Sequence, residues 1–124
     1  MLKILLNESD PMRHQMLRTK LQKHGCRVWS VAHFDDIKSP LQDIAFDLMI
    51  FDLDTKRIDE VIDFATHWKD SPILFQSSSL DFQLDSGSWI ADKLVYKSKN
   101  GKNILQAVDK LITRHNQGDP NGKN

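Results

Sequence analysis

The chain has 124 residues, and its 17 lysines and arginines balance 17 aspartates and glutamates, so the formal net charge is zero. This length favours one domain with its own hydrophobic core, and the lack of a basic excess argues against direct nucleic-acid binding as its main role. No apolar stretch has the length of a membrane span, and the single cysteine, Cys26, has no partner for an internal disulfide. We therefore expect a cytoplasmic domain that is not inserted in a membrane.

The first part of the chain predicts a strand, a helix and a second strand. Lys3–Asn7 is a short apolar run that favours a buried strand. Asp10 suits the N-cap of the following helix and Pro11 its first position. This helix should end near Gly25, which can adopt a left-handed conformation, and residues 26–31 then alternate as a second strand.

The middle of the chain is organised around Leu48–Asp52, an apolar run that ends in an acid, with Asp54 two residues later. A run of this kind is too short for a helix and is typical of a strand buried on both faces of a parallel sheet. Asp52 then lies at the carboxyl end of the strand, where open α/β sheets bind their ligands. The alternative interpretation is that the two acids only begin a turn and cap the next helix.

Helices are predicted on either side of this strand in the sequence. Residues 34–45 carry apolar side chains at helical spacing, although Pro40 should shorten this helix or delay its start. Residues 57–69 repeat the apolar spacing more regularly and predict a further helix.

The last part of the chain alternates in the same way. Pro72–Gln76 predicts a fourth strand, and the stretch of residues 80–92 predicts only a short or irregular helix around Trp89. Leu94–Tyr96 predicts a fifth strand that ends at Lys97, and apolar residues from 104 to 112 predict a final helix. The polar residues 115–124 predict a disordered tail or the start of a linker, which leaves a domain of residues 1–114.

Five strands that alternate with five helices predict a flavodoxin-like α/β fold, a doubly wound five-stranded parallel sheet of order 2-1-3-4-5 with helices on both faces. In that order the carboxyl ends of strands one, three, four and five lie beside each other. The polar residues that follow these strands are Glu8, Ser9, Asp10, Asp52, Asp54, Ser77, Ser78 and Lys97. Because helix capping does not require acids, hydroxyls and an amine to converge at one sheet edge, the convergence predicts a functional site there.

In this combination the chain resembles the receiver domains of bacterial two-component response regulators, over nearly the whole predicted domain. Glu8-Ser9 stands at the family's acidic pair, Asp52 at its phosphate-accepting aspartate, Ser77 at its switch hydroxyl and Lys97 at its lysine. The resemblance implies that Asp52 accepts a phosphoryl group in an in-line displacement. It also implies that Lys97 and Ser77 contact the phosphoryl oxygens, and that carboxylates bind Mg²⁺ beside them.

The chain departs from the family pattern at several of these positions. Ser9 replaces the second acid of the pair and is a poorer metal ligand, so we hypothesise that the side chain of Asp54 joins Glu8 and Asp52 in holding Mg²⁺. Leu94 occupies the aromatic switch position, and Ser98 replaces the proline after the lysine, so no cis peptide is expected there.

The resemblance implies a signalling domain rather than an enzyme. A sensor histidine kinase or a phosphotransfer protein would supply the phosphoryl group, and the output would be a downstream protein or a fused output domain, with a homodimer possible. Two alternatives remain open: a pseudo-receiver that docks proteins without phosphorylation, and a phosphatase of the haloacid-dehalogenase type, in which Asp52 is the nucleophile and Asp54 the acid/base.

Overall fold

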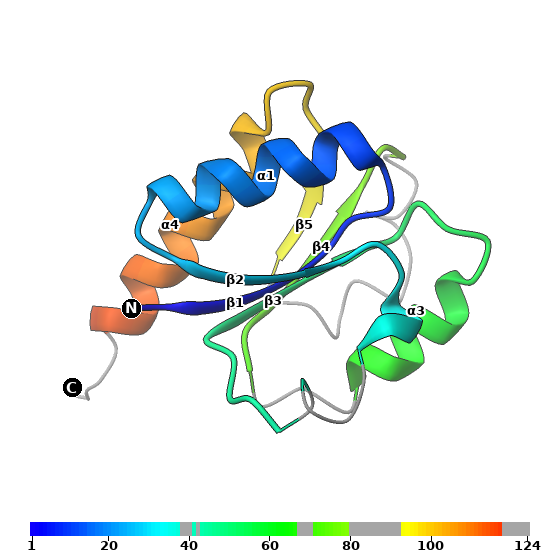
Figure 1. Ribbon diagram of the computed structural model, residues 1–124, viewed down its shortest axis with the longest axis horizontal. Coiled ribbons are helices and arrows are strands. Elements are labelled where there is room, and N and C mark those ends of the chain that lie inside the picture. The colour runs from blue at the N-terminus through cyan, green and yellow to red at the C-terminus, as the bar shows by residue number, and fades with distance from the viewer. Residues whose placement is uncertain (38–40, 42, 67–70, 80–92, 118–124) are drawn as a thin grey trace.

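The computed structural model describes the chain except for residues 38–40, 42, 67–70, 80–92 and 118–124 (Figure 1). Five strands form one parallel sheet in the order β2-β1-β3-β4-β5. The strands are β1 (Lys3–Asn7), β2 (Arg27–Val31), β3 (Leu48–Asp52), β4 (Ile73–Ser77) and β5 (Lys93–Tyr96). Among the described residues, the helices are α1 (Pro11–Lys23), the 3-10 turn η1 (Phe34–Asp36), α3 (Ile58–Thr66) and α4 (Lys102–Gln117). The predicted flavodoxin-like fold and strand order are confirmed.

The three inner strands are the most apolar and the most buried. All five residues of β3 and of β4 are buried, and β1 is buried from Ile4 onward. This burial explains why β3 reads as an unbroken apolar run rather than an alternating one, since a parallel sheet covered on both faces leaves no solvent side.

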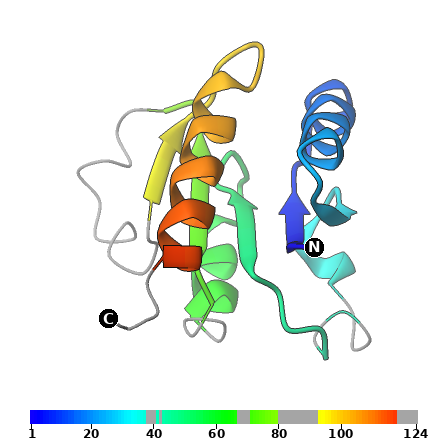
Figure 2. The same ribbon diagram turned by 90° about the vertical axis from the view of Figure 1, so that its left-hand side faces the viewer.

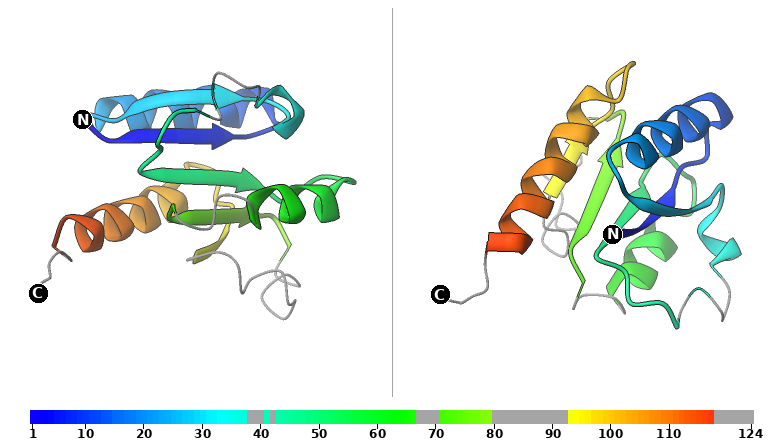
Figure 3. Two further views of the ribbon diagram at one scale, coloured as in Figure 1. Left: turned by 90° about the horizontal axis from the view of Figure 1, so that it is seen from below. Right: turned by 60° about the vertical axis from the view of Figure 1, so that its left-hand side comes forward.

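Two hydrophobic clusters lie on opposite faces of the sheet, and Figures 2 and 3 show the helices that flank these faces. On one face, helices α1 and α4 cover side chains such as Leu6 and Leu74. On the other face, α3 packs on the alternate side chains of the same strands, such as Phe51 and Phe75. The sheet is therefore covered by helices on both faces, as predicted.

Helix α1 begins and ends where the sequence predicts. The Asp10 side chain accepts a hydrogen bond from the backbone N–H of Arg13, and Pro11 occupies the first turn. Gly25 follows the helix with φ of 84°. The strong N-terminal cap and the left-handed glycine fix the length of this helix.

The helix predicted over residues 34–45, which Pro40 should shorten or delay, is missing at both described ends of that range, whereas Leu41 between them is helical. Residues 34–36 form the 3-10 turn η1, and residues 43–45 are not helical. Residues 38–40 and 42 of this prediction lie outside the described residues.

The other predicted boundaries differ from the structure by a few residues. Helix α3 spans Ile58–Thr66 against a prediction of 57–69, whose last residues lie outside the described part of the chain. Helix α4 continues to Gln117, past the predicted start of the tail at residue 115. The predicted short helix around Trp89 also lies outside the described residues, as does the tail from residue 118.

Two expected absences can be checked over the described residues alone. They contain no cis peptide bond, so the bond between Lys97 and Ser98 is trans, as the missing proline predicts. None of their helices combines the length and the apolar character needed to cross a membrane.

Candidate functional site

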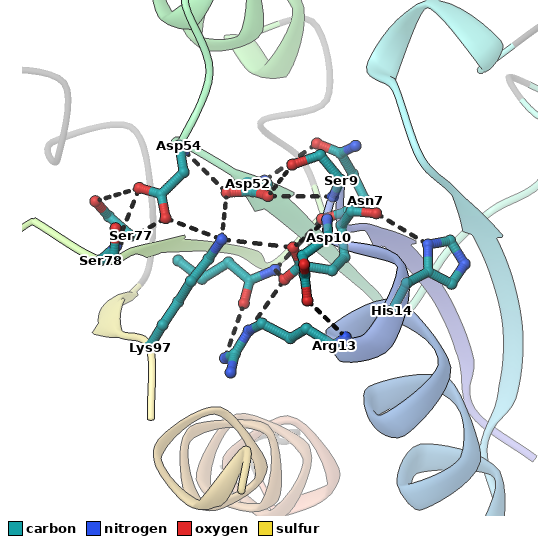
Figure 4. A network of polar contacts seen from close by, with 12 residues as sticks. Asn7, Ser9, Asp10, Arg13, His14, Asp52, Asp54, Ser77, Ser78 and Lys97 are labelled. Carbon is teal, nitrogen blue, oxygen red and sulfur yellow. Dashed lines mark hydrogen bonds and ion pairs between the residues drawn. The ribbon is translucent and has the colours of Figure 1, made fainter. Parts of the chain in front are cut away.

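The carboxyl ends of β1, β3, β4 and β5 bring the predicted polar residues together (Figure 4). Asp52 is the last residue of β3, Ser77 is the last residue of β4, and Lys97 follows β5. Glu8 and Ser9 follow β1. The convergence follows directly from the strand order, because parallel neighbours end at the same edge of the sheet.

Both oxygens of the Asp52 carboxylate accept hydrogen bonds, although only 3% of the residue is exposed. The backbone N–H and the hydroxyl of Ser9 donate to Oδ2 over 3.2 and 3.0 Å. The backbone N–H of Asp54 donates to Oδ1 over 2.9 Å. The side chain of Asp52 is therefore held in one orientation by donors on both oxygens.

Lys97 lies at the centre of the acidic residues. Its Nζ is 2.9 Å from Asp52 Oδ1, 3.0 Å from Asp54 Oδ2 and 3.5 Å from Glu8 Oε2. Burial alone would lower the pKa of Lys97, but the hydrogen bond and the charge of Asp52 outweigh burial and raise that pKa above its ordinary value. The ammonium group is therefore charged and is shared by three carboxylates.

Asp54 turns towards β4, where it meets the predicted switch residue. The hydroxyl of Ser77 donates to Asp54 Oδ1 over 3.1 Å, and the backbone N–H of Ser78 contacts both Asp54 oxygens at 3.0 Å. Burial alone would raise the pKa of Asp54, but the Ser78 amide and Lys97 outweigh it and lower that pKa below its ordinary value. Asp54 and Ser77 thus form a contact that joins the ends of β3 and β4.

Glu8 is fully buried and belongs to a network that sequence reasoning missed. Its Oε1 accepts a hydrogen bond from Arg13 Nε over 3.0 Å and another from Gln76 Nε2 over 3.0 Å. Its Oε2 accepts one from the backbone N–H of Asp10 over 3.0 Å. Burial raises the pKa of Glu8, and the charge of Asp52 raises it further, against the Asp10 amide and Lys97. A signal was available in the sequence, since a glutamine within a buried strand requires a polar partner.

The two remaining predicted residues lie at the margin of the site. The carboxylate of Asp10 caps α1, so its contribution to the pocket is the backbone N–H that Glu8 accepts. Leu94 is partly buried against the cluster on the α3 face of the sheet, whereas Tyr96 is 46% exposed.

A small cavity of about 50 Å³ opens beside Asp52. Ser9, His33, Thr55 and Arg57 contribute to its walls together with Asp52. A group that enters this cavity would lie beside both Asp52 and Ser9.

The donor set does not fit a magnesium ion in the arrangement described. Within the part of the chain that the structure describes, no three Asp, Glu, His or Cys side chains are placed to hold a metal ion. Arg13, Gln76 and the Asp10 amide take the oxygens of Glu8, and Asp54 points to Ser77 and Ser78 rather than towards Ser9. The metal roles of Glu8, Asp52, Asp54 and Ser9 therefore stay predictions that require these contacts to change.

Comparison with solved structures identifies the fold. The response regulator TrrA of Thermotoga maritima, in complex with Mg²⁺-BeF, superposes with a TM-score of 0.77 at 27% identity, covering 90% of this chain and 99% of TrrA. The chain has the receiver-domain fold of response regulators. A two-component response regulator from Clostridium difficile superposes with a TM-score of 0.79 at 16% identity, covering 94% of this chain and 100% of its own.

Other receivers superpose over a similar range. Chemotaxis response regulator CheY4 of Vibrio cholerae has a TM-score of 0.76 at 20% identity, covering 90% of this chain and 98% of its own. No family model and no curated protein sequence matches the chain. The similarity to receivers therefore lies in the three-dimensional fold and in a few residues at the edge of the sheet, whereas the sequence as a whole has diverged.

Proposed function

We propose that this chain is a two-component receiver that accepts a phosphoryl group on Asp52 and thereby switches a protein-interaction face. The observation that carries the proposal is the position of Asp52. It ends the central strand, borders a cavity and has Lys97 Nζ 2.9 Å from one of its oxygens. This combines a nucleophile, a space for the incoming group and a cation for the charge that the group carries.

The transfer requires one bond to form and one to break. Asp52 Oδ2 attacks the phosphorus of a phosphohistidine on the partner, the P–N bond breaks, and the leaving imidazole takes a proton from solvent. Oδ2 is the attacking oxygen in this proposal because its donors, the amide and the hydroxyl of Ser9, are neutral, whereas Oδ1 is paired with the charged Lys97. Lys97 and the hydroxyl of Ser9 lie close enough to Asp52 to stabilise the charge on the transferred group.

The switch follows from the contact between Asp54 and Ser77. A phosphoryl group adds nearly two negative charges beside Lys97, which then has a stronger partner than Asp54. The Ser77 hydroxyl, which is bonded to Asp54 in this structure, would turn to a phosphoryl oxygen and carry Ser78 and Ser79 with it. Release of Asp54 from Ser77 would be the step that couples phosphorylation of Asp52 to a change in Ser78.

The relatives suggest the kind of partner. TrrA, 24% identical to this chain in that structure, forms a complex with the histidine kinase ThkA, and the receiver of DrrB is activated by BeF3. We propose a histidine kinase or a phosphotransfer protein as the phosphoryl donor, in the cytoplasm, and a downstream protein, a fused output domain or a second copy as the receiver of the signal. Residues 1–114 would form the receiver unit and 115–124 its tail or linker.

Magnesium is bound in the TrrA complex. We propose that this chain binds the ion only weakly, because the pocket that would hold it is already occupied by its own side chains. The phosphorylation assay is therefore run with and without the ion.

The test is to incubate the protein with a small-molecule phosphodonor and to measure the intact mass. We expect one phosphoryl adduct that is labile at alkaline pH, is absent in Asp52→Asn and persists in the matched control Asp59→Asn, an exposed acid of α3. An adduct that survives in Asp52→Asn, or no adduct under any condition, would refute phosphorylation of Asp52.

One observation favours the pseudo-receiver as a second candidate. Both oxygens of Asp52 and both of Glu8 are satisfied by groups of the chain itself, as a phosphorylation-independent docking module would allow. The absence of any adduct would select this candidate. The phosphatase alternative is not favoured, because the lowered pKa of Asp54 does not suit a general acid.

A further inference from the structure

Arg13 is the most deeply embedded cation of the pocket outside the predicted site residues. Only 11% of its side chain is exposed, and its Nε lies 3.0 Å from Glu8 Oε1. Its Nη2 donates to Gln76 Oε1 over 3.3 Å and its Nη1 to the backbone oxygen of Ser98. All three guanidinium nitrogens therefore have partners, which come from the residue after β1, from β4 and from the segment after β5.

Gln76 completes this arrangement from the interior of the sheet. It is fully buried, and its Nε2 donates to Glu8 Oε1 over 3.0 Å and to the backbone oxygen of Asn7 over 3.4 Å. A glutamine that donates to Glu8 and accepts from Arg13 orients the two charges towards each other. Since no buried side-chain atom among the described residues lacks a partner, the network is complete without an added ion.

The charges explain what the network does. Counted as ionised, Glu8, Asp52 and Asp54 carry three negative charges. If Lys97 were the pocket's one cation, a net charge of minus two would remain, which one divalent cation would neutralise. Arg13 reduces this excess to one and also takes the Glu8 oxygen that such a cation would use. The attraction for a divalent cation and the number of free ligands therefore fall together.

We propose that Arg13 is an internal cation that occupies Glu8 in place of a metal ion and thereby sets the low divalent-cation affinity of the pocket. The inference concerns the same pocket as the proposed function, but cation binding is measured without a phosphodonor. If Asp52 does not accept phosphate, the inference about cation binding is unaffected. If Arg13 does not control cation binding, the proposed phosphorylation of Asp52 is unaffected.

The experiment compares Mn²⁺ binding, followed by electron paramagnetic resonance of the free ion, in the wild type and in Arg13→Met. We expect the dissociation constant to fall about tenfold or more in the variant, the effect of one unit charge on a divalent ion about 6 Å away at the dielectric constant of water. The matched control is Arg18→Met, which removes the same charge from an exposed position of α1 and should bind Mn²⁺ like the wild type. If Arg13→Met and the wild type have equal dissociation constants for Mn²⁺, whether high or low, the inference is overturned.

A second measurement needs no variant and covers the case in which Arg13→Met does not fold. The Arg13 Nε–H bonded to buried Glu8 should give a protected side-chain resonance in nitrogen-edited NMR spectra of the wild type. It should persist in millimolar Mg²⁺, because the metal does not displace the guanidinium. Loss of this resonance in millimolar Mg²⁺ would overturn the inference.

Discussion

Replacing Lys97 with methionine removes the ammonium group that three carboxylates share, and keeps most of the apolar stem. Its closest contacts are 2.9 Å to Asp52 and 3.0 Å to Asp54, and the exposed fractions are 13% for the Lys97 side chain and 3% for that of Asp52. At an effective dielectric constant of about 20, one such contact is worth roughly 5 kcal/mol before desolvation. Measured losses on removing one partner of a buried pair are about 3–5 kcal/mol. We expect Lys97→Met to lower the free energy of unfolding by about 3 kcal/mol at neutral pH.

The assay is urea unfolding followed by tryptophan fluorescence, with Lys99→Met as the control because Lys99 is exposed. A second variant, Asp52→Asn, removes the nearest negative charge, so the double variant should be more stable than the two single losses predict. We expect a coupling energy of about 1–2 kcal/mol from this cycle. A loss below about 1 kcal/mol in Lys97→Met, or the absence of coupling, would refute the claim that Lys97 neutralises the pocket.

Two further predictions address pH and packing. Because its folded-state pKa is lowered, the ionised Asp54 stabilises the protein above the ordinary aspartate pKa of about 3.9, and this contribution is lost as the pH falls through the folded-state value. The stability difference between wild type and Asp54→Asn in urea unfolding should therefore shrink below about pH 4, and a difference that grows there would contradict the assignment. Gly101 has φ of 72°, and an added Cβ would lie 2.9 Å from Leu17 Cδ2, whereas Gly25, with φ of 84°, has open space around it. Gly25→Ala should cost about 1 kcal/mol from strain alone and Gly101→Ala about 1 kcal/mol more from the clash, and equal thermal shifts would contradict this packing.

The strand pattern and the caps made most of the fold predictable. An unbroken apolar run such as Leu48–Asp52 has few alternatives to a central parallel strand, and the strand order then places its end beside those of its neighbours. The pairing of Asp52 with Lys97 follows from that placement alone. The helix predicted over residues 34–45 is too long at its described ends, because apolar spacing does not show where a helix begins and ends: residues 34–36 form a 3-10 turn and residues 43–45 are not helical.

The network of side chains around Glu8 could not be predicted from the sequence. Arg13 lies on α1, and helical spacing shows which face a residue occupies but not where a long, flexible side chain ends. The buried Gln76 indicates that a polar partner lies nearby, but the sequence does not show which residue that partner is. Only the packed structure shows that the two meet on Glu8, and hence that the pocket carries its own positive charge.

The division of the hydrophobic core between the two faces of the sheet also bears on how the chain folds. The face under α1 needs α4 for completion, since Ile104 and Val108 pack in the same cluster as Ile4 and Leu17. During synthesis, therefore, the face of the first strand that bears Ile4 and Leu6 stays only partly covered, by α1, until the last helix has left the ribosome. Completion of this part of the core therefore requires contacts between the first and the last elements of the sequence. We expect nascent chains that stop before Lys102 to be bound by chaperones and digested readily, and the protease-resistant state to appear only when α4 is complete.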